Sequence, residues 1–238
     1  MRVVVTGAAG RIGRAFTGSP APPGWEVVAT DRVATGTIEL LDVTDPRACH
    51  RALSSADAVV HLAADPATSA DFRTSVLPLN MVGTYNIVAA AVDAGLGRVV
   101  FASSIQAVAG YPLDVQVRED DPPRPANDYG VGKAFGEALC ASMAVRSTTT
   151  FLSVRIGNYA EQRPPADASL RNRMAWLSPR DAVHLLWCAL AADVDGHLVL
   201  HGISDNAAKQ LSIAATRLRI GYAPVDDAFV EADGARRR

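Results

Sequence analysis

The feature that most constrains this chain is a short β-branched run, Val3–Val5, followed at once by a glycine-rich turn. The turn carries Gly7, Gly10 and Gly13 in a GxxGxxG pattern, and a helical pattern begins near Arg11. The first glycine permits a tight turn, the second lets backbone approach a pyrophosphate, and the third lets the helix pack on the strand. A strand, turn and helix in this order place free backbone N–H groups where they can bind phosphate. We therefore expect the chain to begin with a dinucleotide-binding unit.

The rest of the chain alternates short apolar runs with longer segments of helical periodicity. We expect strands at 25–30, 36–41, 58–62, 98–102, 149–156 and 197–201, and helices at 46–54, 80–94, 129–143 and 182–192. Valine-rich strands without polar alternation are typical of a parallel sheet that is covered on both faces. The pattern predicts an α/β fold, a Rossmann-type doubly wound parallel sheet with a small C-terminal part.

The periodicity becomes less regular near Gly157, which suggests a division of the chain there. We expect residues 1–157 to form the cofactor-binding core with the catalytic helix, and residues 158–238 to form a small substrate-binding part integrated with that core. The last stretch, 227–238, has little apolar content and ends in three arginines, so we expect a mobile tail.

Composition excludes several classes of function. The chain of 238 residues has a formal net charge of −2, which gives no electrostatic reason to expect nucleic acid or a membrane as a partner. Its 3 cysteines are widely spaced and contain no CxxC, so we expect neither disulfides nor a metal. No signal-peptide pattern is present and the apolar runs look too short to span a bilayer, which favours the cytoplasm.

Acidic residues at the ends of two expected strands suggest the adenosine end of the cofactor site. Asp31 ends the second strand, where a carboxylate can bind the ribose hydroxyls of NAD and exclude a 2′-phosphate. The next residue, Arg32, could instead accept the phosphate of NADP, so we favour NAD and leave NADP open. Asp42 and Val43 follow the third strand, and we expect them near the adenine, although Asp42 also fits an ordinary loop aspartate.

The catalytic candidates are Tyr129 and Lys133, which lie one helical turn apart on one face of an expected helix. A phenol has a reference pKa of about 10 and is a poor base at neutral pH. A nearby ammonium group, together with the cationic nicotinamide ring, favours the phenolate, so we expect the pKa of Tyr129 to move toward working pH. Ser103 and Ser104 follow the fifth expected strand and can supply a hydroxyl that holds the substrate oxygen. This set predicts proton exchange with a substrate hydroxyl or carbonyl, coupled to hydride transfer.

Two further polar residues allow two readings each. Asn80 is expected to begin the helix at 80–94, either as its N-cap or as a polar anchor near Lys133 and the cofactor. His61, within an apolar strand, is expected to be a buried histidine with satisfied hydrogen bonds rather than a catalytic base.

These residues together resemble the extended short-chain dehydrogenase/reductases, the NAD-dependent epimerase/dehydratase family. The matching segments are VVVTGAAGRIG, TDR, LDVTD, VVHLAA, NMVGTYNIVAAA, VVFASS and YGVGKAFGE, in the order of the family. The resemblance implies a Ser104–Tyr129–Lys133 triad and a homodimer that pairs through the two long helices, 80–94 and 129–143. It implies contacts to NAD(P) from Gly7, Ala9, Gly10, Arg11, Ile12, Gly13, Asp31, Arg32, Asp42, Val43, Leu62, Ala63, Ala64, Asn80, Lys133 and Ile156.

Within that family the chain is similar to the uronate dehydrogenases, which oxidise the C1 hydroxyl of a hexuronic acid. The similarity implies substrate contacts from Ser103, Ser104, Ile105, Gln106, Tyr129, Asn158 and Arg173. Arg173 matches the arginine that holds the sugar carboxylate, a group suited to two parallel N–H···O bonds. The chain departs from that family where Ile105-Gln106 replaces Asn-His, and where only Thr68 or Ser69 could supply an expected serine hydroxyl.

Three hypotheses of function follow. The first is an NAD-dependent dehydrogenase acting on a hydroxyl of a small polyol or sugar acid, for which Arg173 would favour acidic substrates. The second is an epimerase, dehydratase or ketone reductase acting on a sugar nucleotide. The third is a non-catalytic dinucleotide sensor, which the retention of Tyr129 and Lys133 disfavours.

Overall fold

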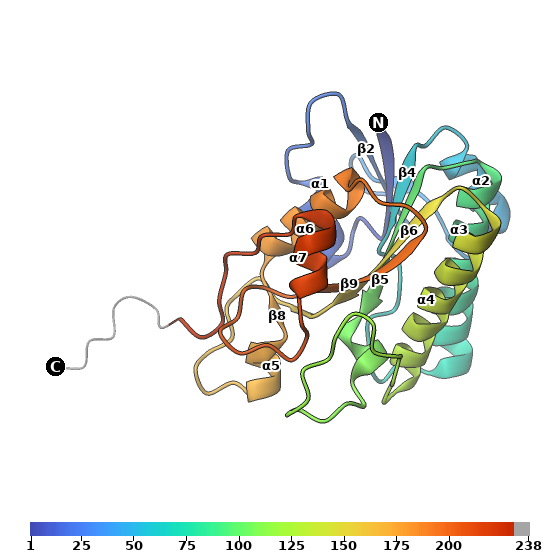
Figure 1. Ribbon diagram of the computed structural model, residues 1–238. Coiled ribbons are helices and arrows are strands. Elements are labelled where there is room, and N and C mark those ends of the chain that lie inside the picture. The colour runs from blue at the N-terminus through green and yellow to red at the C-terminus, as the bar shows by residue number, and fades with distance from the viewer. Residues whose placement is uncertain (231–238) are drawn as a thin grey trace.

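Seven strands form one parallel sheet, which confirms the predicted doubly wound fold (Figure 1). The computed structural model describes residues 1–230, and the rest of the expected mobile tail lies outside the described residues. The strand order is β3-β2-β1-β4-β5-β6-β9, with bounds β1 Arg2–Thr6, β2 Glu26–Asp31, β3 Glu39–Leu40, β4 Ala58–His61, β5 Arg98–Ser104, β6 Thr150–Ile156 and β9 His197–Gly202. The strand order reverses between β1 and β4, and a crevice opens there at the carboxyl ends of the strands.

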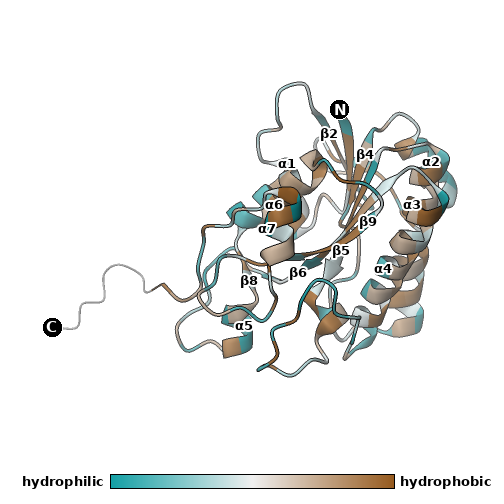
Figure 2. Ribbon diagram, in the orientation of Figure 1, coloured by the Kyte–Doolittle hydropathy of each residue, from teal (hydrophilic) through white to brown (hydrophobic). Residues whose placement is uncertain are grey.

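Helices cover both faces of this sheet (Figure 1). One face carries α1 (Arg11–Thr17), α6 (Pro179–Ala191) and α7 (Ala214–Ile220), and the other carries α2 (Pro46–Leu53), α3 (Gly83–Asp93) and α4 (Asp128–Arg146). Each face has its own buried apolar cluster, one around Phe16 and Leu185 and the other around Ile87 and Phe101. Hydrophobic colour runs along the strands β2 and β4 between these layers (Figure 2).

The expected strands are present, with shifted ends. The strand expected at 36–41 is reduced to Glu39–Leu40, because Gly36 takes a φ of +58° and a bridge joins Thr35 to Ile38 in a turn. The strand expected at 98–102 continues to Ser104, so Ser103 and Ser104 are its last residues rather than the start of a loop. The short 3-10 helix η2 (Ile105–Val108) follows directly.

The helix expected to begin at Asn80 begins earlier. A π-helix, η1 (Phe72–Val82), precedes α3 without a break, and the Asp71 carboxylate accepts hydrogen bonds from Arg73 N and Thr74 N at its start. The N-cap interpretation of Asn80 is therefore wrong, because this residue lies inside helical backbone. Together η1 and α3, Phe72–Asp93, form the one helical stretch among residues 1–230 that is long and apolar enough to cross a membrane by length and composition. The expectation that every apolar run is too short was wrong on those criteria, but this stretch packs against α2 and α4 in the core.

The C-terminal part completes the main sheet. Strand β9 pairs with β6, and α6 covers one face of the sheet. A separate pair of short strands, β7 (Asn158–Tyr159) and β8 (Trp176–Leu177), lies beside the short helix α5 (Leu170–Met174) (Figure 1). The described start of the expected mobile tail is held in place, since Asp227 accepts a hydrogen bond from Ala207 N and Ala228 N donates one to Asn206 Oδ1.

Candidate active site

The glycine turn has the close contacts that its pattern predicts. Gly7 has a φ of +72°, and a Cβ at this residue would lie 2.6 Å from Ala63 N in the segment after β4. A Cβ at Gly13 would lie 2.3 Å from Gly7 O, so α1 can approach the turn only because no side chain is there. Gly10 caps α1 without a side-chain hydrogen bond, which leaves backbone N–H groups of the first helical turn open to an anion.

Two adjoining cavities extend along the carboxyl ends of the strands from this turn. They have volumes of about 410 and 470 Å³ and share Gly7, Gly10, Leu62, Ala64 and Pro66. The first, here called the catalytic cleft, extends to Ser104 and Tyr129, and the second extends to Asp31 and Asp42. Two cavities that meet at a glycine turn can together hold the two halves of a dinucleotide.

The residues present fit a nicotinamide dinucleotide. Of the expected cofactor contacts, all except Asn80 line one of the two cavities. The Asp31 carboxylate accepts hydrogen bonds from Ala9 N at 3.0 Å and from Val33 N at 3.3 Å, which holds it at the rim where a ribose would lie. Hydrogen bonds from Thr44 keep the pKa of Asp42 below its usual value, with a smaller contribution from Arg32.

Asn80 holds the backbone of a loop that lines the cleft. Its Oδ1 accepts a hydrogen bond from Asp65 N at 2.8 Å, and its Nδ2 donates one to Asp65 O at 3.0 Å. Asp65 Oδ2 in turn accepts a hydrogen bond from Ser75. The buried Asn80 therefore fixes the loop that lines both cavities. It anchors the backbone of this loop, and it does not itself line either cavity.

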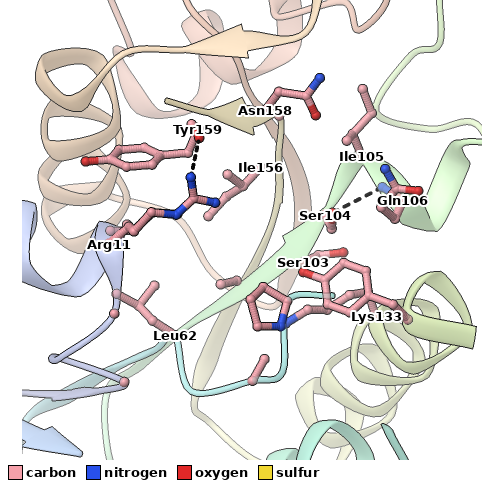
Figure 3. Close-up of a pocket in the computed structure, with 18 of the residues that line it drawn as sticks. Arg11, Leu62, Ser103, Ser104, Ile105, Gln106, Lys133, Ile156, Asn158 and Tyr159 are labelled. Atoms are coloured by element: carbon pink, nitrogen blue, oxygen red, sulfur yellow. Dashed lines mark hydrogen bonds between the residues drawn. The ribbon is translucent and has the colours of Figure 1, made fainter. Parts of the chain in front are cut away.

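Ser104, Tyr129 and Lys133 all line the catalytic cleft, and Figure 3 shows Ser104 and Lys133 there. Lys133 Nζ lies 5.5 Å from the centre of the Tyr129 ring and 5.1 Å from that of Phe101. Ser104 Oγ accepts a hydrogen bond from Gln106 N at 3.1 Å. Three elements, β5, η2 and α4, thus place these polar groups in one wall of the cleft.

Burial dominates the electrostatics of Tyr129 and Lys133 in the chain alone. Burial raises the pKa of Tyr129, the Ser104 hydrogen bond lowers it, and the Asp65 charge raises it further, so the net shift is upward. Burial also lowers the pKa of Lys133 to about 7. Desolvation disfavours both charged forms in the chain alone. The expected downward shift of the Tyr129 pKa also involves the charge of the bound nicotinamide ring, so it stays a prediction.

The structure confirms that His61 is a buried histidine with satisfied hydrogen bonds. Its Nδ1 lies 2.7 Å from Thr6 Oγ1 and its Nε2 lies 3.1 Å from Thr84 Oγ1, and burial lowers its pKa to about 3. His201 is also buried, with Nδ1 2.7 Å from Ser212 O. Neither ring lines the catalytic cleft.

Most expected substrate residues line the catalytic cleft, and two of them need comment. Ser103 lines it, but its hydroxyl donates to the buried Glu137, so this group is already used. Arg173 does not line it: its guanidinium donates to the carbonyl oxygens of Ala166 and Ala228 and lies 4.1 Å from the centre of the Phe229 ring. The carboxylate clamp expected of Arg173 is therefore not assembled in this structure.

Several residues that the sequence reasoning missed line the cleft or support it. Tyr159 lies beside Arg11, and Arg11 Nη1 donates a hydrogen bond to Tyr159 O at 3.4 Å. Both residues lie on the opposite side of the cleft from Ser104 (Figure 3). Glu137 and Arg155 form a buried ion pair behind the cleft, with Nη2 2.9 Å from Oε2. A charge in each of two apolar segments, AFGEAL and LSVRIG, was the available signal for that pair.

Known proteins resemble this chain over most of its length. Residues 3–167 match the NAD dependent epimerase/dehydratase family. The NAD-dependent glucose-6-phosphate dehydrogenase of Haloferax volcanii is 36% identical, with 94% of this chain and 93% of that protein covered. The L-arabinose 1-dehydrogenase (NAD(P)(+)) of the same organism is 35% identical, with 95% and 97% covered.

A solved structure has a similar fold. A mutant of the uronate dehydrogenase from Agrobacterium tumefaciens, in a complex with NAD, is 30% identical and superposes with a TM-score of 0.83, with 95% of this chain and 85% of that chain covered. These similarities confirm the expected fold and the expected nicotinamide cofactor. The chain belongs to the NAD dependent epimerase/dehydratase family and is an NAD(P)-dependent oxidoreductase that acts on CH–OH groups.

Proposed function

We propose that this protein is a dehydrogenase that uses NAD to oxidise a hydroxyl of a small sugar or sugar acid. The observation that carries the proposal is that Ser104, Tyr129 and Lys133 share one cleft with the glycine turn. The two relatives that match along nearly their whole length are named for glucose 6-phosphate and arabinose, and a structural relative is named for uronate. The cleft of about 410 Å³ must also take the nicotinamide end of the cofactor, which suits a single sugar unit rather than a sugar nucleotide.

The proposed chemistry assigns one task to each residue. Tyr129 takes the proton of the substrate hydroxyl, Ser104 holds the same oxygen, and the Lys133 ammonium stabilises the phenolate. When bound, the oxidised dinucleotide supplies the hydride acceptor and a positively charged ring. Burial removes water from Tyr129 and Lys133, which makes the interaction of each charge with a neighbouring charge stronger.

Whether the substrate carries a carboxylate depends on Arg173. The expected uronate-like substrate requires a guanidinium for its carboxylate, and Arg173 is held by Ala166, Ala228 and Phe229. Arg11 is the arginine that lines the catalytic cleft within residues 1–230, on the side of the glycine turn. We propose a carboxylate substrate only on condition that Arg173 exchanges its present partners for the substrate.

A panel of sugars with NAD or NADP tests the function through the absorbance of the reduced cofactor. It should contain glucuronate, galacturonate, arabinose, glucose and glucose 6-phosphate. Oxidation of at least one free sugar with NAD supports the proposal, and tight cofactor binding without turnover of any of them contradicts it. The variant Arg173→Ala separates the substrate classes: a KM raised for uronates alone supports a carboxylate clamp, and an equal change on neutral sugars contradicts one.

A further inference from the structure

Asn127, directly ahead of α4, makes two hydrogen bonds with its side chain. Its Oδ1 accepts from Gly130 N at 2.8 Å, which makes Asn127 the N-cap of the catalytic helix. Its Nδ2 donates to Gln106 Oε1, also at 2.8 Å. One amide group therefore connects the start of the helix that carries Tyr129 to a residue on η2.

The direction of this connection follows from the chemistry of the groups. A backbone N–H only donates, so Asn127 must turn its carbonyl oxygen to Gly130 N. Its NH₂ group then faces Gln106 and also only donates, so Gln106 must turn its carbonyl oxygen to Asn127. The amide of Gln106 is left with its NH₂ group, and no acceptor within residues 1–230 is bonded to Gln106 Nε2.

Gln106 lies where such a donor reaches a substrate. It lines the catalytic cleft, and its backbone N donates to Ser104 Oγ (Figure 3). A Cβ at Gly130 would lie 2.3 Å from Gln106 O, so the first turn of α4 packs directly on this residue. The position of the Gln106 amide is thereby fixed relative to Ser104 and to the helix of Tyr129.

We propose that Asn127 is a positioning residue that makes Gln106 a hydrogen-bond donor to the sugar. Gln106 Nε2 donates to an oxygen of the substrate, and Asn127 prevents the amide from turning its carbonyl to the cleft instead. This proposal rests on the proposed function and adds a specificity-determining group to it. The site selects an oxygen that accepts a hydrogen bond at this position, and it disfavours a substrate with an N–H group there.

Replacement of Asn127 by aspartate or serine tests this relay. Asn127→Asp keeps an acceptor for Gly130 N, because aspartate and asparagine cap helices about equally well. Its carboxylate accepts from Gln106 Nε2, so the amide inverts and turns Oε1 to the substrate. Asn127→Ser keeps the cap but releases Gln106, without adding a charge. We expect KM for the sugar to rise roughly 10-fold in Asn127→Asp and by less in Asn127→Ser, with the KM for NAD and the melting temperature unchanged.

A double-mutant cycle with Gln106→Leu separates the relay from a purely structural role. In the Gln106→Leu background, Asn127→Asp should change KM by less than about 2-fold, because the group on which it acts is gone. An equal effect of Asn127→Asp in both backgrounds would overturn the proposal, as would a fall in melting temperature that accounts for the whole loss of activity.

A second readout does not need turnover. The side-chain NH₂ hydrogens of Asn127 should exchange with water more slowly than those of Gln106, and Asn127→Asp should slow those of Gln106. If the wild type oxidises none of the sugars, the proposed function has failed while this exchange pattern still reports on the relay. Equally fast exchange of both NH₂ groups would overturn the relay itself.

Discussion

The buried ion pair Glu137–Arg155 should respond very differently to single and double substitution. The two side chains are 5% and 2% exposed and share two N–H···O bonds, of 2.9 and 3.0 Å. Glu137 also accepts a bond from Ser103, and Arg155 donates one to Asp121 O. Each charge thus has its partners within the fold, and neither can be rehydrated when the other is removed.

The magnitude follows from this burial. Glu137→Gln leaves the Arg155 charge without a counter-ion, and Arg155→Met leaves that of Glu137, so each should lower the free energy of unfolding by about 3–5 kcal/mol. The double variant removes both charges and keeps an acceptor for Ser103, so it should be less destabilised than the sum of the single variants by about 2 kcal/mol or more. Asp120→Asn is the control, because the pair Arg118–Asp120 is 72% and 75% exposed and should contribute within about 0.5 kcal/mol.

Urea unfolding measures these differences, with the fluorescence of the 3 tryptophans as the signal and linear extrapolation to water. Glu137 lies on α4 and Arg155 on β6, so the pair joins the catalytic helix to the sheet. Losses below about 1 kcal/mol for the single variants, or strict additivity in the double variant, would refute the reasoning.

The remaining predictions concern acid stability, cofactor choice and assembly. Burial lowers the pKa of His61 and of His201 to about 3, while the unfolded chain titrates near 6.5, so stability present above that pH is lost as the pH falls toward 3. Free energies of unfolding from urea titrations at pH 7.5 and 5 should differ by about 2 kcal/mol for each histidine, and a His61→Asn variant with the full pH dependence would exclude this cause. Asp31→Ala should raise the Kd of NAD about 10-fold or more and that of NADP less. Titration calorimetry that gives an unchanged ratio of the two Kd values would contradict the ribose role. The homodimer through α3 and α4 stays a prediction: sedimentation should give twice the mass of the chain, and Tyr85→Asp, at an α3 residue that is 49% exposed, should halve it, whereas a monomeric wild type would exclude the dimer.

Much of the fold could be predicted because its signals are local. The glycine turn, the valine runs and the pair Tyr129 and Lys133 each depend on short-range geometry, and all lie where their patterns indicate. The start of the helix near Asn80 could not be predicted, because η1 is a π-helix with Pro78 inside and its periodicity differs from that of an α-helix.

Features that depend on contacts distant in sequence could not be predicted. Nothing in the local sequence indicates that Phe229 and Ala228 hold Arg173, or that Glu137 holds the Ser103 hydroxyl. The upward pKa shift of Tyr129 has the same origin, since it depends on how deeply the surrounding elements bury the phenol. The role of Asn127 needed both the cap geometry and the position of Gln106.

The central claim is that Tyr129 exchanges a proton with the substrate beside a bound nicotinamide dinucleotide. The variant Tyr129→Phe tests it most directly, because it removes one oxygen at a residue that is 9% exposed and leaves the ring in place. Single-turnover oxidation of the sugar should slow by about 100-fold or more, while the Kd of NAD stays within about 2-fold of the wild type. An unchanged rate in Tyr129→Phe would contradict the account.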